Sequence, residues 1–207
     1  MSGVRKSIAS SLVELVLIVA GALGLALLIQ AFVVKPYRIP SRSMFPTLHV
    51  NQRLLVDRVA TSFTSPHIGE ILVFHPPANY TSCANPSEGQ NDSGQDSPMA
   101  CDVVQKRESS MTFIKRVVGL PGDRISIRNG HVFRDGVRER DPYIVPCPGD
   151  PACNFLKTIT IPRGDYYVMG DNRPDSEDSR FWGPIRKSWI IGQAFFTYWP
   201  PDRVGFL

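Results

Sequence analysis

The sequence predicts a mainly β domain that follows a single N-terminal membrane-spanning helix. Residues 15–34 contain no charged side chain, which is the pattern of a membrane span. Beyond them, several short apolar runs are bounded by turn-forming residues, as in antiparallel sheets. The chain also holds 16 glycines and 18 prolines among its 207 residues, which favours turns and short strands over long helices.

The apolar run covers residues 12–34. About 20 apolar residues at a rise of about 1.5 Å match the ~30 Å hydrocarbon core of a bilayer. Glu14 and Gln30 lie near its two ends, where they can reach the interface. A cleaved secretory signal would have a shorter apolar core followed by a small-x-small site, and the sequence FVVKPYR that ends and follows the run offers none. We therefore expect an uncleaved anchor over 12–34.

Charge does not decide which way this helix is oriented. Arg5 and Lys6 precede the run, and Lys35 and Arg38 follow it, so the positive-inside rule is nearly balanced. The whole chain has a formal net charge of +4 and a pI near 9.0, without a dense basic segment. This composition disfavours nucleic-acid binding and fits attraction to an anionic membrane surface.

All four cysteines lie beyond the apolar run, which suits disulfides in an oxidising compartment. Cys147 and Cys153 bracket the turn-prone sequence PGDPA, so we favour this pair together with Cys83–Cys101. Free buried thiols are the alternative. A zinc site would need closely spaced cysteine pairs, which the sequence lacks.

The remaining chain reads as short strands. Runs at residues 53–57 and 70–74 are apolar and bounded by turns, and Asn129-Gly130 centres a hairpin because both residues tolerate positive φ. Asp135-Gly136 predicts a second tight turn, and residues 166–170 and 193–199 predict later strands. Residues 78–110 are rich in Asn, Ser, Gly, Gln and Pro, which indicates a loop insertion or a disordered segment. Two glycosylation sequons begin at residues 79 and 91.

A first chemically suggestive stretch is IPSRSMFPTL at residues 39–48. It contains Ser41 and Ser43, and a serine becomes a nucleophile only when a base removes its proton. The α/β-hydrolase pattern G-x-S-x-G is missing. His67, His75 and His131 fall in or beside predicted strands and turns, where a surface role is the simpler interpretation. A proline-stiffened junction with structural serines is the alternative for the whole stretch.

A second stretch, TFIKRVVGLPGD, offers a different base. Neighbouring side chains of a strand point to opposite faces, so Lys115 and Arg116 cannot both face solvent. An inward lysine is desolvated, which lowers its pKa and makes it a general base. A lysine that snorkels from a strand edge is the alternative.

A third stretch, MGDNRPDSEDSRFWG at residues 169–183, is dense in polar side chains. The calcium-loop pattern D-x-[DN]-x-[DN]-G fails, because Arg173 and Ser176 occupy two of its positions. We interpret the stretch as a hydrogen-bond network with Asp178 and Arg180 as an ion pair. A solvated turn is the alternative.

Together, SRSMFPTL, FIKRVVGLPGD and GDNRPDSEDSRFWG, in this order behind an apolar anchor, resemble the type I signal peptidases of bacteria, which are Ser/Lys proteases. RLLVDRV and IGEILVF support the resemblance, which covers the anchor and most of 35–207 but not 78–110. It implies a β-rich extracytoplasmic catalytic domain at 35–207, held by the 12–34 anchor at the outer face of the cytoplasmic membrane, with residues 1–11 in the cytoplasm. Asn51-Gln52 departs from the family, which often has Gly-Asp there.

The resemblance also implies roles for individual residues. Ser43 matches the nucleophile and Lys115 the general base, and the Ser41 hydroxyl matches the group that completes an oxyanion hole with the Ser43 N–H. Ser176 matches the serine that orients the lysine. Asp178 and Arg180 match the supporting ion pair.

The implied substrate is a signal peptide of a preprotein, with small side chains at the first and third positions before the cut. The matching pocket residues are Tyr37, Ile39, Pro40, Met44, Leu48 and Ile114. Membrane lipid is the other expected partner, and no metal or organic cofactor is implied. A self-cleaving Ser/Lys repressor would need a DNA-binding N-terminal domain in place of the anchor, and an inactive binding domain would lack Ser43 or Lys115.

Overall fold

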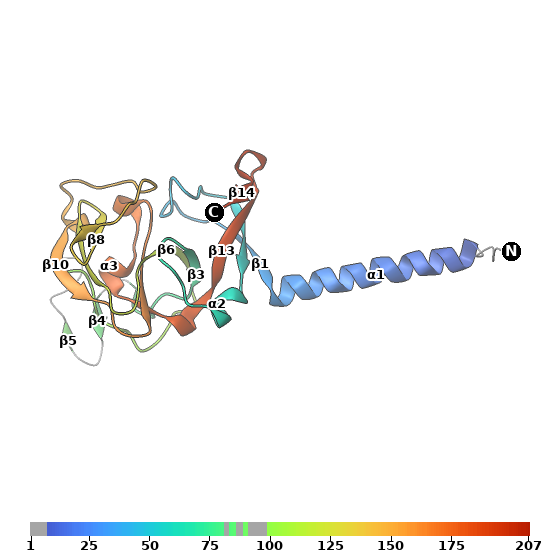
Figure 1. The fold of residues 1–207 in the computed structure, drawn as a ribbon, viewed down its shortest axis with the longest axis horizontal. Helices are drawn as coiled ribbons and strands as arrows, with labels where there is room; N and C mark the ends of the chain where they lie inside the picture. Colours follow the sequence, from blue (N-terminus) through green and yellow to red (C-terminus); the bar gives the residue numbers. More distant parts are fainter. Residues whose placement is uncertain (1–7, 81–82, 86–88, 91–98) are drawn as a thin grey trace.

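The computed structural model describes residues 8–80, 83–85, 89–90 and 99–207. Residues 1–7 of the predicted cytoplasmic segment, the sequon at 91–93 and most of residues 81–98 lie outside this set. The helix α1 (Ile8–Phe32) projects as a long arm from a β domain (Figure 1). It begins four residues before the start of the predicted span of 12–34 and ends two residues before the end of that span. Every residue of 11–27 is exposed. No helix among the described residues meets the length and hydropathy of a membrane span.

One antiparallel sheet forms the frame of the domain. Its order is β1-β2-β13-β3-β6-β11-β12, and β14 pairs with β13. The strand bounds are β1 (Val34–Arg38), β2 (Arg53–Asp57), β3 (Ile71–Phe74), β6 (Phe113–Gly119), β11 (Asp165–Met169), β12 (Ile185–Arg186), β13 (Ile190–Trp199) and β14 (Gly205–Phe206). The mainly antiparallel β architecture predicted from the sequence is confirmed.

A second antiparallel sheet lies at the end of the domain remote from α1 (Figure 1). Its strands run in the order β10 (Phe155–Thr160), β7 (Arg124–Arg128), β8 (His131–Arg134) and β9 (Val137–Arg138). Asn129 and Gly130 join β7 to β8 with φ of 52° and 84°, and Asp135 with Gly136 makes the next turn at 50° and 82°. Both predicted tight turns are therefore confirmed.

The 78–110 segment is only partly the loop that its composition predicts. It contains the two-residue strands β4 (Ala84–Asn85) and β5 (Gly89–Gln90). Its last third packs on the domain instead, because Ala100, Cys101 and Gln105 are buried and the Cys101 N–H donates to the Arg180 carbonyl at 2.9 Å. The Cys83–Cys101 disulfide ties it down, and Cys147–Cys153 forms the second predicted pair.

Strand β6 is covered on both faces, which the sequence did not predict. It lies between β3 and β11 near the middle of the frame, and six of its seven residues are buried. Alternation along a strand would allow one of Lys115 and Arg116 to face solvent, yet the two side chains are only 4% and 9% exposed. Two cations on opposite faces of one buried strand both need compensation by the surrounding residues.

The short helices α2 (Ala60–Phe63) and α3 (Ser179–Trp182) complete the domain with two 3₁₀ turns that concern the site, η1 (Pro151–Cys153) and η2 (Arg173–Asp175). Three apolar clusters fill the space between and beside the sheets. The cluster nearest the first serine motif contains Ile39, Met44, Leu48, Leu54, Val56, Ile71, Val73, Ile114 and Ala194.

Candidate active site

Ser43 and Lys115 meet in the folded chain. The serine lies in the turns that follow β1, and the lysine projects from β6. The Lys115 Nζ donates to the Ser43 Oγ at 2.7 Å, and the two residues are 4% and 7% exposed. This is the geometry of a nucleophile beside its base.

Backbone contacts hold Ser43 in place. Its carbonyl accepts from the Asn172 N–H at 3.0 Å, and the Asn172 Nδ2 donates to the neighbouring Arg42 carbonyl at 3.1 Å. Gly170 lies so close that a Cβ there would collide with the Ser43 carbonyl and the Ser176 hydroxyl. The third motif therefore forms a fixed wall against which the nucleophile turn packs, and glycine is required for that approach.

Ser41 lies beside the nucleophile, with its Oγ 3.3 Å from the Ser43 Oγ. Ser41 is exposed, so its hydroxyl can rotate toward the cleft. The predicted contribution of Ser41 to an oxyanion hole stays a prediction.

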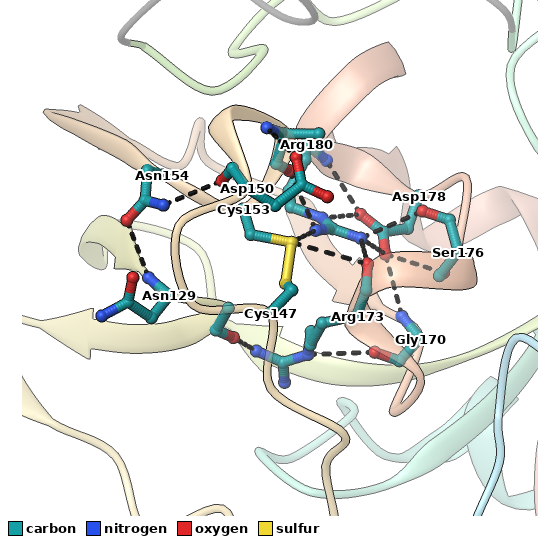
Figure 2. Close-up of a disulfide and its surroundings, with 12 residues drawn as sticks. Asn129, Cys147, Asp150, Cys153, Asn154, Gly170, Arg173, Ser176, Asp178 and Arg180 are labelled. Carbon is teal, nitrogen blue, oxygen red and sulfur yellow. Dashed lines mark hydrogen bonds and ion pairs between the residues drawn. A yellow bond between two sulfur atoms is a disulfide. The ribbon is translucent and has the colours of Figure 1, made fainter.

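Asp178 and Arg180 form the predicted ion pair, and both are fully buried. The Arg180 Nε donates to Asp178 Oδ1 at 2.8 Å and its Nη2 to Oδ2 at 3.0 Å (Figure 2). Asp178 Oδ2 also accepts from the Gly170 N–H at 3.0 Å. Arginine and hydrogen bonds to the charged form lower the pKa of Asp178 although burial opposes this. Asp178 therefore stays ionised, and Arg180 compensates the charge of its carboxylate.

Ser176 does not make its predicted contact. Its hydroxyl donates to Asp178 Oδ2 at 2.8 Å, and the described chain contains no hydrogen bond between Ser176 and Lys115. A hydroxyl has a single proton to donate, and a charged carboxylate is a stronger acceptor for it than an amine. The predicted role of Ser176 in orienting the lysine stays a prediction.

The environment of Lys115 lowers its pKa from 10.5 to about 8. Desolvation by burial is the largest cause, and the field of Arg180 adds to it. Asp178, Asp171 and Glu177 act in the opposite direction. Arg180 thus acts against the effect of Asp178, and the amine loses its proton around pH 8.

A second buried ion pair compensates the other face of β6. The Arg116 guanidinium binds Asp171 through its Nε at 2.9 Å and its Nη2 at 2.7 Å. It also donates to the Gly69 carbonyl at 2.6 Å, and Asp171 accepts from the Thr47 hydroxyl. This pair links all three sequence motifs. The Arg116–Asp171 ion pair was not predicted from the sequence. The only pointer to it was that Asp171 directly follows Gly170 in the third motif.

A cleft of about 680 Å³ opens onto Ser43 and Lys115. Of the predicted pocket residues, Tyr37, Ile39, Pro40 and Ile114 line it. Met44 and Leu48 are not among the residues that line it, because both are fully buried in the apolar cluster beneath the serine turn. Their spacing of four brings them together in the turn, where the Leu48 N–H donates to the Met44 carbonyl at 2.8 Å.

The cleft has further walls that the sequence did not reveal. No histidine is among the residues that line it. The fold also brings to the cleft these lining residues, which the sequence did not predict: Arg38, Val73, Met111, Thr112, Phe113, Ala152, Arg173, Pro174, Asp175, Glu177 and Phe181.

Comparison with known proteins gives consistent matches. The family model described as "Signal peptidase, peptidase S26" matches residues 12–199. "Probable signal peptidase I-1" of Synechocystis sp. is 39% identical over 186 residues, covering 90% of this chain and 82% of that protein. "Signal peptidase I" of Leptolyngbya laminosa is 36% identical, with 96% and 85% covered. A crystal structure of a signal peptidase I from Enterococcus faecalis aligns with a TM-score of 0.37 at 24% identity, covering 63% and 97% of the two chains.

The burial of Lys115 predicts an effect on stability that is separate from activity. The folded pKa of about 8 lies below the unfolded value of 10.5, so the unfolded chain binds more protons between these pH values. Wild-type stability should therefore rise with pH from 8 to 10.5, by up to about 3 kcal/mol. Lys115→Met should be the more stable protein at pH 7 and lose this advantage by pH 10. Denaturant unfolding in detergent at both pH values checks this, and equal pH dependence of the two proteins would contradict it.

Proposed function

The chain belongs to the signal peptidase family, peptidase S26, as a serine endopeptidase that cleaves signal peptides, and we propose that it does so with Ser43 as nucleophile and Lys115 as general base. The observation that carries the assignment is the 2.7 Å hydrogen bond between the Lys115 Nζ and the Ser43 Oγ in a buried site. A lysine whose pKa is about 8 is half neutral at pH 8, whereas only about one free lysine in 250 is.

The proposed reaction starts from the neutral amine. Lys115 takes the Ser43 proton while the Oγ attacks the scissile carbonyl carbon, and the resulting oxyanion is stabilised by the Ser43 N–H and the Ser41 hydroxyl. The ammonium then protonates the leaving amine, which departs as the N-terminus of the mature protein. A water molecule deprotonated by Lys115 hydrolyses the acyl-enzyme. The Asp178–Arg180 pair keeps the charge around the lysine nearly balanced throughout.

The substrate is proposed to bind as an extended strand. β11 pairs with β6 only from Arg116 onward, so the edge of Phe113, Ile114 and Lys115 that faces away from β3 has no partner in the described sheet. This edge lines the cleft, and an extended peptide can complete it with main-chain hydrogen bonds. The buried side chains of Ile39 and Ile114 then leave room near Ser43 for small substrate residues.

We propose that α1 anchors the domain in the membrane, with residues before it in the cytoplasm and the β domain outside. The helix has 25 residues, and the large apolar side chains over 12–27 are exposed around it, which suits a lipid environment. Two disulfides in the β domain support its placement in an oxidising space. Membrane lipid is thus the second proposed partner.

Cleavage of a preprotein tests the catalytic assignment. Detergent-solubilised protein should release a mature chain whose new N-terminus, read by sequencing, follows a small-x-small site. Its kcat/KM should rise with pH through an apparent pKa of about 8, because only neutral Lys115 accepts the proton. Ser43→Ala and Lys115→Met should each abolish cleavage.

The histidines provide the control. His67→Ala, His75→Ala and His131→Ala remove imidazoles that do not line the cleft, and each should keep most of the activity. An active Lys115→Met protein together with one inactive histidine variant would show that imidazole takes the proton.

The pocket predicts a preference for size. A Leu or Phe side chain just before the cut would have to displace the packed Ile39 and Ile114, and overfilling an apolar site costs roughly 1–3 kcal/mol. Substrates that carry it should show kcat/KM about 5- to 150-fold below the alanine substrate. Equal values for the Ala and Leu substrates would rule out these two residues as the pocket wall.

The orientation of α1 is tested in spheroplasts. Protease added outside should digest residues 35–207 and leave the N-terminal end protected. Complete protection of the β domain would reverse the proposed topology.

A further inference from the structure

The Cys147–Cys153 disulfide lies next to the Asp178–Arg180 ion pair. The proposed chemistry makes no use of this disulfide. It closes a loop that ends in η1. The Arg180 Nη1 donates to the Ala152 carbonyl at 3.1 Å and to the Cys153 Sγ at 3.5 Å (Figure 2). The loop therefore supplies two acceptors to the guanidinium that neutralises Asp178.

The loop is fastened to the β7–β8 hairpin. The Gly130 N–H donates to the Cys153 carbonyl at 2.9 Å, and the Cys147 N–H donates to the Asn129 carbonyl at 3.2 Å. Gly130 has φ of +84°, and a Cβ there would press on the Cys147 Sγ at 3.1 Å. The disulfide is thus packed against the tight turn of a regular sheet, which makes the loop a rigid support.

From this support, contacts lead to the nucleophile. The Arg180 Nη2 donates to the Arg173 carbonyl at 2.7 Å and to the Ser176 carbonyl at 3.0 Å, so one side chain spans the loop and the third motif. Arg180 also binds Asp178, whose carboxylate holds the Gly170 N–H. Gly170 forms the wall beside Ser43, and Ala152 of the loop lines the cleft itself.

We propose that Cys147 and Cys153 are positioning residues of the dyad: their disulfide holds the Ala152 carbonyl and the Cys153 sulfur in the places where Arg180 binds them. Arg180, fixed in this way, keeps its charge beside Asp178 and keeps water away from Lys115. The proposal rests on the assignment of Lys115 as the base.

The charged groups around Lys115 give the direction of the effect. Asp178, Asp171 and Glu177 raise its pKa, while burial and Arg180 lower it. An opened loop frees Arg180 to move from Asp178 and admits water, and both changes raise the pKa of Lys115. The neutral fraction of the amine at pH 7 then falls further, and kcat/KM falls with it although the nucleophile is intact.

The test compares Cys147→Ala/Cys153→Ala with wild type in preprotein cleavage across pH. The rising limb of kcat/KM should move to higher pH by about 0.5–1 unit, which lowers the rate at pH 7 by about three- to tenfold. Activity should recover toward the alkaline end. Ile127→Val is the matched control, because it removes a methyl group from buried β7 without touching Arg180 and should keep the wild-type profile.

Reduction with dithiothreitol provides a second route that does not depend on folding of the double variant. Reduced wild type should acquire the shifted profile. Because dithiothreitol also opens Cys83–Cys101, the double variant is reduced in parallel, and any change in it measures the effect of that second bond. A double variant or reduced wild type with an unshifted limb would overturn the proposal, as would an equal shift in Ile127→Val.

A readout independent of cleavage separates this proposal from the proposed function. The pH dependence of acylation of the Lys115 amine, measured by mass spectrometry of the labelled peptide, reports its pKa directly. Absence of cleavage by wild type would remove the peptidase assignment alone. An unchanged labelling profile in the double variant would remove the positioning role alone.

Discussion

The desolvated amine of Lys115 is the constraint on which the rest of the site depends. An ammonium group in a protein interior costs several kcal/mol unless it is paired, and the described structure gives Lys115 no salt bridge of its own. It meets a serine hydroxyl instead, and a nearby carboxylate that already has a cation. Asp178 raises the pKa of the lysine, and Arg180 beside it acts in the opposite direction. Burial then decides the pKa.

That arrangement needs a strand that is covered on both faces. β6 is such a strand. Because its opposite face is also covered, Arg116 becomes a second buried cation whose charge must be compensated. Asp171 binds Arg116 through both carboxylate oxygens, and Thr47 from the serine motif donates to the same carboxylate. Two of the three aspartates of the third motif, Asp171 and Asp178, thus serve the two faces of one strand.

The sequence was sufficient where structure is local. Asn129-Gly130 determines its turn by its own φ preferences, and the short apolar runs become strands wherever they find partners. It failed where tertiary contacts decide. Alternation along β6 could not reveal that both faces would be covered, and the apolar character of Met44 and Leu48 fits a cavity floor as well as a cavity wall. The Ser176 contact followed from resemblance, whereas the actual bond depends on an orientation of Asp178 that only the fold defines.

Ser43 and Lys115 are 72 positions apart in the chain. Their meeting requires β3 to pair with β6 and the third motif to pack on the serine turn, and both contacts join residues distant in sequence. Such nonlocal contacts form late and slowly during folding. An unfolded or half-folded chain therefore carries an ordinary protonated lysine and an inert serine. On the proposed assignment, Ser43 is activated as a nucleophile only by the completed topology.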